Sequence, residues 1–361
     1  MATSTGRRRN GINGREAVAG WLFTLPAILI VGVFLAIPVL MALWVSVSDW
    51  KGFGPPIGGR AQFVGLENYG DVLYTDFGSN PALAQKDFGT SIRNNFYYVL
   101  LVVPLQTALA LFLAVQVNRR MLRGKGFFRT AFYFPSVTSS IAITTVWLFL
   151  FTASGAVNQI IGLFGAEGPN WFNRPDGLIH NLLGVFGVTS PPGWMQAPGF
   201  LGISGWEWIS GPSVAMTALI FLAVFTTSGT FMLLFLAALQ NIGAEIDEAA
   251  LMDGAGAFRK FFSVTLPMLK PTLFTVLTLG LIGTWQVFDQ IYLAGGGAPG
   301  KTTLTPAFLA YETSFDSLEW GRGAAIAFVL FAIIVVLTLL QRFILRDRDA
   351  PTRGAAKAVT K

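Results

Sequence analysis

The sequence predicts an all-α integral membrane protein with six transmembrane helices and a polar helical segment between the fourth and the fifth. Hydrophobic residues make up 53% of the 361 residues and charged residues only 12%, whereas about 25% of residues in soluble domains are charged. A membrane-spanning helix needs about 20 mostly apolar residues. Six stretches meet this requirement: residues 19–47, 94–117, 130–152, 213–239, 271–294 and 323–345.

The basic residues orient these spans, because lysine and arginine near span ends are retained in the cytoplasm. If both termini, the 118–129 connection and the 240–270 segment share one side, that side holds 18 of the 25 basic residues. The other side holds seven basic and eleven acidic residues. Both termini are therefore predicted to be cytoplasmic. The net charge of +6 follows from this asymmetry, which makes a nucleic-acid-binding patch the less favoured interpretation.

The chain is expected to begin with a basic cytoplasmic tail, residues 1–18, and to end with a small, polar tail, residues 348–361. The six-span domain occupies residues 19–347 between them. The arginines at 7–9 precede an apolar run, as in a signal peptide. That run is longer than the 7 to 15 residues of a signal sequence, and no small-residue cleavage pattern directly follows it. An uncleaved first span is therefore favoured.

The first two spans contain prolines, Pro26, Pro38 and Pro104. A proline inside a span leaves a carbonyl that neighbouring helices or a local distortion must accommodate. Kinked helices packed in a bundle are therefore expected.

Three external loops are predicted, residues 48–93, 153–212 and 295–322. The second is long enough to indicate a functional or partner-contacting element, although tryptophans there also suit an aromatic belt at headgroup depth. They are Trp171, Trp194, Trp206 and Trp208. His180 in this loop is the only histidine and cysteine is absent. A metal site and a Ser-His-Asp arrangement are therefore not expected.

The cytoplasmic segment 240–270 reads as helix, turn and helix. Its first helix begins with acidic residues that suit the positive end of the helix dipole: Glu245, Asp247 and Glu248. Four residues share one face at i, i+3, i+4 and i+7 spacing, and most are small enough to allow close approach by another protein: Ile246, Ala249, Ala250 and Asp253. The two glycines of DGAGA then predict a sharp turn.

The second helix of this segment is AFRKFFSVT, which is expected to end at Leu266 and Pro267 because proline interrupts the backbone hydrogen bonds of a helix. Taken alone, the segment equally fits an ordinary amphipathic helix at the membrane interface.

One motif match is misleading. Gly295, Gly300, Lys301 and Thr302 satisfy the phosphate-loop pattern G-x-x-x-x-G-K-[ST]. A working phosphate loop needs a preceding strand and a following helix, and here the match follows the fifth span on the predicted external side. A Gly-rich external loop is the favoured interpretation, and no cofactor is expected to bind this chain directly.

The 240–270 segment carries a resemblance to a known family. Glu248-Ala249-Ala250, then Gly254 and then Leu266-Pro267 resemble the EAA motif of membrane-spanning permease subunits of binding-protein-dependent ABC importers. The stretches FVGLENYGDVL and WQVFDQIYLAGGGAP are similar to the sugar branch, typified by the maltose and glycerol-3-phosphate permeases.

This resemblance implies a prokaryotic inner-membrane protein whose 240–270 segment is the coupling helix, seated on a cytoplasmic ATPase subunit. The residues that it assigns to ATPase coupling are Glu245, Glu248, Ala249, Ala250, Asp253, Gly254, Leu266 and Pro267. It further implies a second permease, expected to be a different chain, two copies of an ATPase that uses ATP and Mg²⁺, and an external solute-binding protein. The stretch HNLLGVFGVTSPPGWMQAPGFLGISGWEW is longer than the common form of this branch and leaves the contact with the binding protein open.

A substrate path for a sugar or related polyol is expected along the fourth and fifth spans. Ionisable groups inside a membrane are costly and usually face a cavity or a partner. Gln286, Asp289 and Gln290 are expected on one helical face, with Trp285 and Tyr292 nearby, and Thr227 and Thr230 are candidates on the fourth span. Asp289 near the outer end also fits a solvated or packing residue, and span hydroxyls often bond their own helix.

Two other functions remain open at this point. A polytopic membrane enzyme of the glycosyltransferase type would need paired acidic residues at one membrane face, and the external carboxylates are scattered. A self-contained secondary transporter would leave the cytoplasmic segment unexplained. A transport subunit without catalytic residues is therefore the favoured prediction.

Overall fold

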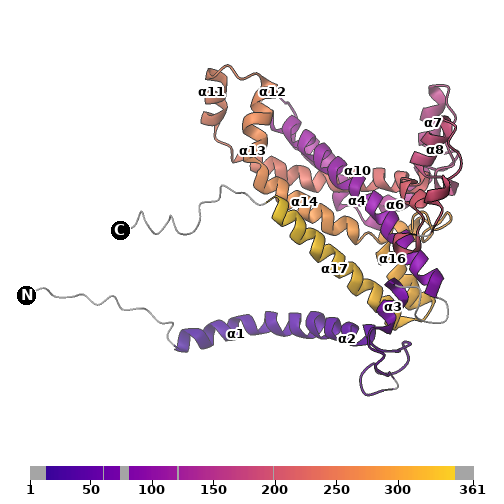
Figure 1. Ribbon diagram of the computed structural model, residues 1–361. Coiled ribbons are helices and arrows are strands. Elements are labelled where there is room, and N and C mark those ends of the chain that lie inside the picture. Colours follow the sequence, from indigo (N-terminus) through magenta and orange to yellow (C-terminus); the bar gives the residue numbers. More distant parts are fainter. Residues whose placement is uncertain (1–13, 60, 74–80, 120–121, 198, 346–361) are drawn as a thin grey trace, which may run out of the picture.

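The computed structural model is all-helical over the residues that it describes, which are 14–59, 61–73, 81–119, 122–197 and 199–345 (Figure 1). The only β-type pairings among them are two isolated bridges, Ser48 with Phe63 and Gly177 with Ser213. Most of the predicted N-terminal tail and the whole of the predicted C-terminal tail lie outside the described residues.

Five helical segments within this part of the chain are long and apolar enough to cross a membrane. The first joins α1 (Gly14–Val31), η1 (Gly32–Ala36) and α2 (Ile37–Ser46). The others are α4 (Pro81–Asn118), α10 (Val214–Gln240), α14 (Lys270–Trp285) with α15 (Asp289–Leu293), and α17 (Trp320–Ile344). The helix of the second span starts before the predicted boundary at residue 94.

The predicted span 130–152 is not one straight helix. It is divided into α5 (Lys125–Val137) and α6 (Ser140–Leu150), which are bent by 96°. Pro135 and the hydroxyl-rich sequence after it favour turns over a continuous helix. Ser136 stabilises the bend, because its Oγ donates to Thr226 O of α10 at 2.5 Å and accepts from Thr230 N at 3.1 Å. The pair counts as a sixth span only if both helices belong to one crossing.

Two prolines follow π-helical turns. Pro38 comes shortly after η1, and Pro267 shortly after η5 (Phe261–Thr265). Proline has no N–H and its ring crowds the carbonyl of the preceding turn. A widened turn moves that carbonyl away, so the helix continues past the proline.

The prediction that the second cytoplasmic helix ends at Leu266 and Pro267 is therefore wrong. The helical backbone continues from α12 (Ala257–Lys260) through η5 into α13 (Leu266–Met268). Only a tight turn at Leu269 separates α13 from α14. The helical backbone of the 240–270 segment therefore leads into the fifth span with only this turn between them, and α14 runs in a different direction from α12 (Figure 1).

The core is built around α10, which packs against α4, α5 and α14. Close approach depends on glycine: a Cβ on Gly229 would lie 2.3 Å from Phe132 O of α5, and a Cβ on Gly280 would lie 2.4 Å from Gln106 Nε2 of α4. By contrast, α1 lies apart from this bundle in Figure 1, and only α2 packs on α17.

The outer ends of the first and last spans are held together by α3 (Glu67–Leu73). Asn68 Nδ2 donates to Ser46 O and Ser48 O at the end of the first span. Asp71, which is buried, accepts a hydrogen bond of 2.8 Å from Arg322 of α17. This helix therefore fixes the spacing of the two spans.

The segment before α10, predicted to be an external loop, carries several short helices. They are α7 (Ala156–Leu163), η2 (Trp171–Asn173), α8 (Leu178–Val185), η3 (Gly193–Met195), η4 (Phe200–Gly202) and α9 (Gly205–Ile209). Ser204 and Glu207 form a capping box on α9. Burial raises the pKa of Glu207, but hydrogen bonds from Ser204 and the charges of Lys86 and Arg93 outweigh it and leave this pKa below its usual value.

Candidate functional site

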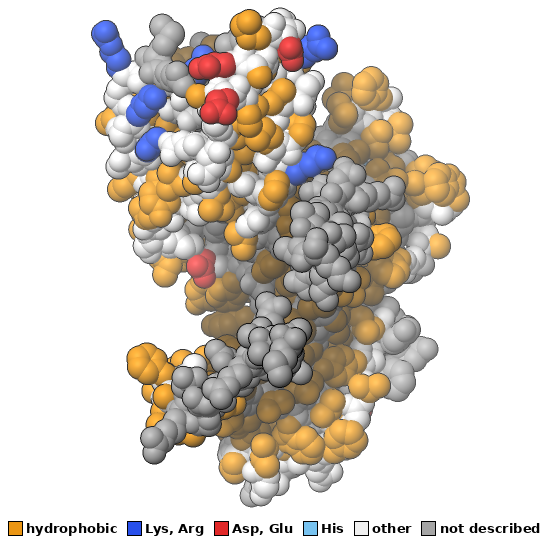
Figure 2. All heavy atoms as spheres, turned by 90° about the vertical axis from the view of Figure 1, so that its left-hand side faces the viewer, with side chains coloured by type: hydrophobic (Ala, Val, Ile, Leu, Met, Phe, Trp, Pro, Cys, Tyr) orange, Lys and Arg blue, Asp and Glu red, His pale blue; other side chains and the backbone are white. Residues whose placement is uncertain are grey.

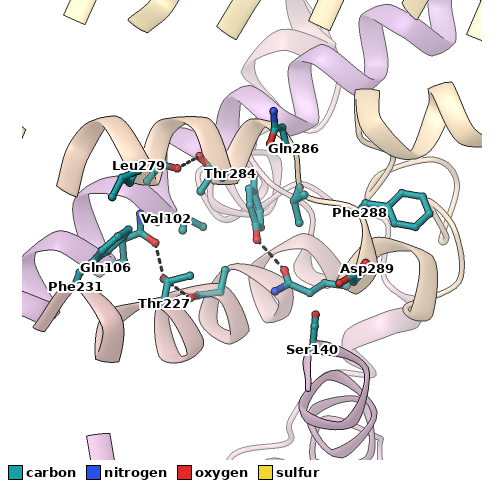
Figure 3. Close-up of a pocket in the computed structure, with 16 residues that line it drawn as sticks. Val102, Gln106, Ser140, Thr227, Phe231, Leu279, Thr284, Gln286, Phe288 and Asp289 are labelled. Carbon is teal, nitrogen blue, oxygen red and sulfur yellow. Dashed lines mark hydrogen bonds between the residues drawn. The ribbon is translucent and has the colours of Figure 1, made fainter. Parts of the chain in front are cut away.

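A cavity of about 260 Å³ lies where α4, α6, α10 and the fifth span meet (Figure 3). Helix α4 contributes Tyr98, Val102 and Gln106, α6 contributes Ser140, and α10 contributes Ala223, Thr227 and Phe231. The fifth span supplies the remaining wall, Leu279, Gly280, Gly283, Thr284, Gln286, Val287, Phe288, Asp289 and Gln290. The cavity is therefore built from helices that are distant in sequence.

The fifth span forms this wall because its helix is interrupted. α14 ends at Trp285 and α15 begins at Asp289, with non-helical backbone at Phe288. The carbonyl of Val287 accepts a hydrogen bond of 3.1 Å from the buried hydroxyl of Thr305, which satisfies one of the backbone groups released by the break. Polar groups of an interrupted helix can be retained inside a membrane only where they are buried in protein or face a cavity.

Two side-chain hydrogen bonds join the helices that form the cavity walls. Tyr98 Oη donates to Gln290 Oε1 at 3.0 Å, which joins α4 to α15. Thr227 Oγ1 lies 2.5 Å from Gln106 Oε1, which joins α10 to α4. Figure 3 shows Gln106 and Thr227 directed toward each other, with Ser140 directed toward Asp289 from α6.

A second cavity of about 360 Å³ adjoins the first. Five residues line both: Ser140, Thr227, Phe231, Leu279 and Gln290. The bend between α5 and α6 forms its other side, with Pro135, Ser136 and Thr138. The two cavities together form one passage along α10, lined by both polar and apolar side chains.

The chemistry of the passage suits a neutral, hydroxyl-bearing ligand. Its described lining offers amides, hydroxyls and aromatic rings, and Asp289 is the one charged residue in the first cavity. A few polar groups among apolar and aromatic walls are typical of small-molecule sites. No group of three or more potential metal-binding side chains occurs among the described residues.

The predicted substrate-path residues divide into three groups. Thr227, Gln286, Asp289 and Gln290 line the first cavity, and Thr230 lines the second. Trp285 is buried in the hydrophobic core, and Tyr292 stacks on Phe288 in an aromatic cluster, and neither lines either of these two cavities.

The expected single helical face is also wrong. Gln286 follows the end of α14, whereas Asp289 and Gln290 belong to α15 after the break. The three side chains meet at the cavity because the backbone changes direction between them.

Sequence reasoning missed the contribution of α4 and α6. Tyr98, Gln106 and Ser140 line the cavity but were not candidates. Gln106 carried a usable signal, since an amide in the middle of an apolar span is costly unless it has a partner. Gln106 is fully buried.

The 240–270 segment, predicted to be cytoplasmic, forms the second candidate site, as a hairpin of α11 (Ala244–Met252) and α12. Gly254 has a φ of +70° and follows the helix, and Ala255 N donates to Ala250 O at 3.0 Å. This bond from the residue after a left-handed glycine to the last turn is a Schellman motif. Gly254 therefore determines how α11 ends.

The hairpin presents charged and apolar side chains to its surroundings. Glu245, Glu248, Ala249 and Asp253 are exposed, whereas Ala250 is buried. Met252 is 88% exposed and Phe258 is 79% exposed. In Figure 2 charged side chains gather at the top of the face, where Figure 1 shows α11 and α12 beyond the ends of the spans. Leu266 is half-buried and Pro267 exposed at the base of the segment.

The Gly-rich motif after the fifth span lies in a series of turns. Gly295, Gly300 and Lys301 have positive φ angles, and the next helix, α16 (Pro306–Tyr311), starts after Thr305. Lys301 Nζ pairs with Asp87 at 2.7 Å. The lysine of the motif is thus engaged at the outer end of α4.

Two solved structures of bacterial transporters have a fold similar to that of this chain. A bacterial ABC transporter involved in the import of the acidic polysaccharide alginate superposes with a TM-score of 0.68 at 17% identity, over 93% of this chain and 98% of that chain. The same transporter in complex with an alginate pentasaccharide-bound periplasmic protein gives a TM-score of 0.65 at 17% identity, with the same coverage of both chains. At this identity the likeness concerns the fold alone.

Several of the sequence relatives are named as sugar permeases. The lactose transport system permease protein LacF of Rhizobium radiobacter is 30% identical over 96% of this chain and 100% of the relative. The trehalose/maltose transport system permease protein MalF of Thermococcus litoralis is 31% identical over 90% of this chain and 93% of the relative. Residues 96–349 match the family described as binding-protein-dependent transport system inner membrane component. The chain therefore belongs to this family and is a sugar-branch permease subunit of an ABC importer, a transport subunit and not an enzyme.

Proposed function

We propose that this permease carries a mono- or oligosaccharide, or a related polyol, through the passage of Figure 3. In this proposal an external solute-binding protein delivers the sugar, and a second permease completes the path. A separate cytoplasmic ATPase dimer binds ATP and Mg²⁺ and drives transport through the α11–α12 hairpin.

The proposed substrate path rests on one observation, the interruption of the fifth span. Substrate sites of membrane transporters are often formed by discontinuous helices near the middle of the membrane. Here the break directs Gln286, Asp289 and Gln290 into the cavity that Thr227 also lines. Amide and carboxylate groups bind sugar hydroxyls, and the ring of Phe231 offers an apolar surface for a sugar face.

The hairpin is suited to bind an ATPase because it lies beyond the spans and has a defined shape. Exposed glutamates surround a surface of small residues, and Met252 is exposed at the end of α11. A large apolar side chain left in water indicates an interaction site. Because the helical backbone leads almost without interruption from α12 into the fifth span, a movement of the hairpin would reach the cavity wall directly.

The second permease would complete the molecule on the side of the first span. Among the described residues, helix α1 packs extensively only within the span to which it belongs. Apolar side chains such as Phe23 and Phe34 are largely exposed there. We propose that lipid covers part of this surface and that a related, non-identical permease covers the remainder.

For the topology we propose six crossings, with α5 and α6 as the third, and both termini in the cytoplasm. The basic residues Arg119, Lys125 and Lys260 support this orientation because they line one cavity beside the hairpin. Lysine and arginine accumulate on the cytoplasmic side of membrane proteins.

The test is to purify the permease with its ATPase and to measure sugar-stimulated ATP hydrolysis. Glu248→Gln should reduce both ATPase co-purification and stimulated turnover, since an exposed carboxylate of the docking helix is lost. Glu167→Gln is the matched control, because Glu167 is equally exposed but lies in the external segment. Unchanged assembly and turnover in the Glu248 variant would contradict the coupling role.

A further inference from the structure

The external segment contains an arm that exposes large apolar side chains. The arm consists of residues 154–188 and includes α7 and α8, which lie together at the outer side of the molecule in Figure 1. In each helix one polar side chain bonds within the protein, Asn158 in α7 and His180 in α8, whereas large apolar side chains at the helix ends are exposed. A water-soluble loop would show the opposite arrangement.

In α7 the inward side is fixed by Asn158. Its Nδ2 donates to Ala153 O at 3.1 Å and to Pro169 O at 3.0 Å, and its Oδ1 accepts from Trp171 Nε1 at 2.8 Å. On the other side Leu163 and Phe164 are 83% and 84% exposed. The Asn158 side chain thus forms its hydrogen bonds within the protein, while the apolar C-terminal end of α7 is exposed.

Helix α8 repeats this arrangement. His180 stacks on Trp206 with ring centroids 4.3 Å apart, and its Nε2 lies 3.1 Å from Trp206 O. Val185 and Phe186 are 81% and 75% exposed at the other end. The backbone of Leu178 donates to Pro212 O at 2.9 Å, so α8 is also fixed to the start of α10.

The two tips resemble each other in sequence. Residues 160–165 read IIGLFG and residues 182–187 read LLGVFG, and in both the last glycine adopts a positive φ after the helix. Charged residues are absent from 130–166 and again from 177–206. Two uncharged tips, each with an exposed aliphatic and an exposed phenylalanine side chain, therefore belong to one arm.

We propose that this arm is a membrane anchor, with Leu163, Phe164, Val185 and Phe186 inserted into the outer leaflet of the bilayer beside the transport path. Helices that lie in the interface bury an apolar side at the boundary of headgroups and acyl chains. In Figure 1, α7 runs across the direction of α10 and α14 rather than along it, as a helix in the membrane plane would.

Lipid fits this surface better than the solute-binding protein does. A binding protein leaves after each delivery, and its docking surface must tolerate water in the meantime. Interfaces of transient complexes are about as polar as the remaining protein surface. Charge-free tips that expose four large apolar side chains instead suit a permanent apolar environment. The partner contact first expected for residues 153–212 is thereby replaced, for these two helices, by lipid.

The chain contains no cysteine, so single cysteines can be introduced without a background. Phe164→Cys and Phe186→Cys would be labelled with an environment-sensitive fluorophore in the full-length protein. The labelled protein is then reconstituted into phosphatidylcholine vesicles with or without brominated acyl chains. We expect blue-shifted emission, quenching by the brominated lipid and little quenching by aqueous iodide. Ile160→Cys provides a third position on the same side of α7.

Glu167→Cys and Arg174→Cys are the controls, because both side chains are charged and exposed in the same arm. Their labels should be quenched by iodide and not by brominated lipid. The proposal is overturned if the labels at 164 and 186 behave like these controls. It is equally overturned if they become shielded from iodide only when the other transporter subunits or a binding protein are added, because the tips would then bind protein.

Discussion

Replacement of Gly254 by alanine tests the role of the backbone shape of the turn after α11, because the exposed side chains of α11 stay unchanged. The left-handed backbone at φ +70° costs a non-glycine residue about 1 kcal/mol or more. A Cβ on Gly254 would meet no atom of the chain within 4 Å, so backbone strain is the whole effect within this protein. A cost of about 1 kcal/mol lowers the population of the native turn, relative to alternatives, about fivefold.

Gly256 provides a matched control two residues away. Its backbone is extended at φ −62° and ψ 163°, and its Cβ position is also free. Gly256→Ala should therefore leave ATPase binding unchanged, whereas Gly254→Ala should weaken it about fivefold. Gly254→Asn should fall between them, because asparagine tolerates the left-handed region better than alanine does.

The assay is the equilibrium affinity of the purified permease pair for its ATPase, with a thermal melt of each variant to show that the spans remain folded. Equal affinity for the Gly254→Ala and Gly256→Ala variants would refute the reasoning, because the Schellman turn would then have no role in docking. A Gly256→Ala variant weakened by the same factor would refute it as well, since that substitution introduces no strain.

Three further predictions concern the cavity, the outer clamp and pH. Gly280→Ala should push the Gln106 amide aside, reduce sugar uptake and cost about 1–3 kcal/mol in stability, and normal uptake with an unchanged melting temperature would contradict the close approach. Asp71→Asn should destabilise the protein by about 1.5–3 kcal/mol, because Arg322 keeps Glu319 as an ion-pair partner but loses its charge-assisted bond to the buried Asp71 carboxylate, and a melt in detergent measures this. The pKa of Glu207 is lowered in the folded protein. The stabilisation that the Glu207 carboxylate contributes is therefore present above the unfolded pKa and is lost as pH falls through the folded pKa. Glu207→Gln should remove this acid-sensitive part of the stability, which melts at several pH values measure.

The spans were predictable because their signal is local and strong. An apolar run of about 20 residues has few alternatives to a membrane helix, and the predicted positions of four spans differ from the helices by a few residues. The bend after Pro135 was not predicted, because it depends on hydrogen bonds from Ser136 to α10. Such contacts join residues about ninety positions apart and leave no periodic pattern in the sequence.

In the candidate sites, too, the features with a local sequence signal could be predicted, and those that depend on long-range contacts could not. The turn at Gly254 could be predicted because glycine after a helix has a local meaning. The cavity could be predicted only in part. Its walls come from α4, α6, α10 and the fifth span, and the fifth span lines it at a break in the helix. Pro267 led to an error, since proline often ends a helix, but here the π-helical turn before it lets the helix continue.

The central claim is that the α11–α12 hairpin is cytoplasmic and binds the ATPase. Met252→Cys tests it directly, because Met252 is exposed and the chain has no other cysteine. In inside-out vesicles from which the ATPase has been removed, a membrane-impermeant maleimide should label this cysteine, and added ATPase should protect it. Labelling of intact cells from outside, or labelling unaffected by the ATPase, would contradict the account.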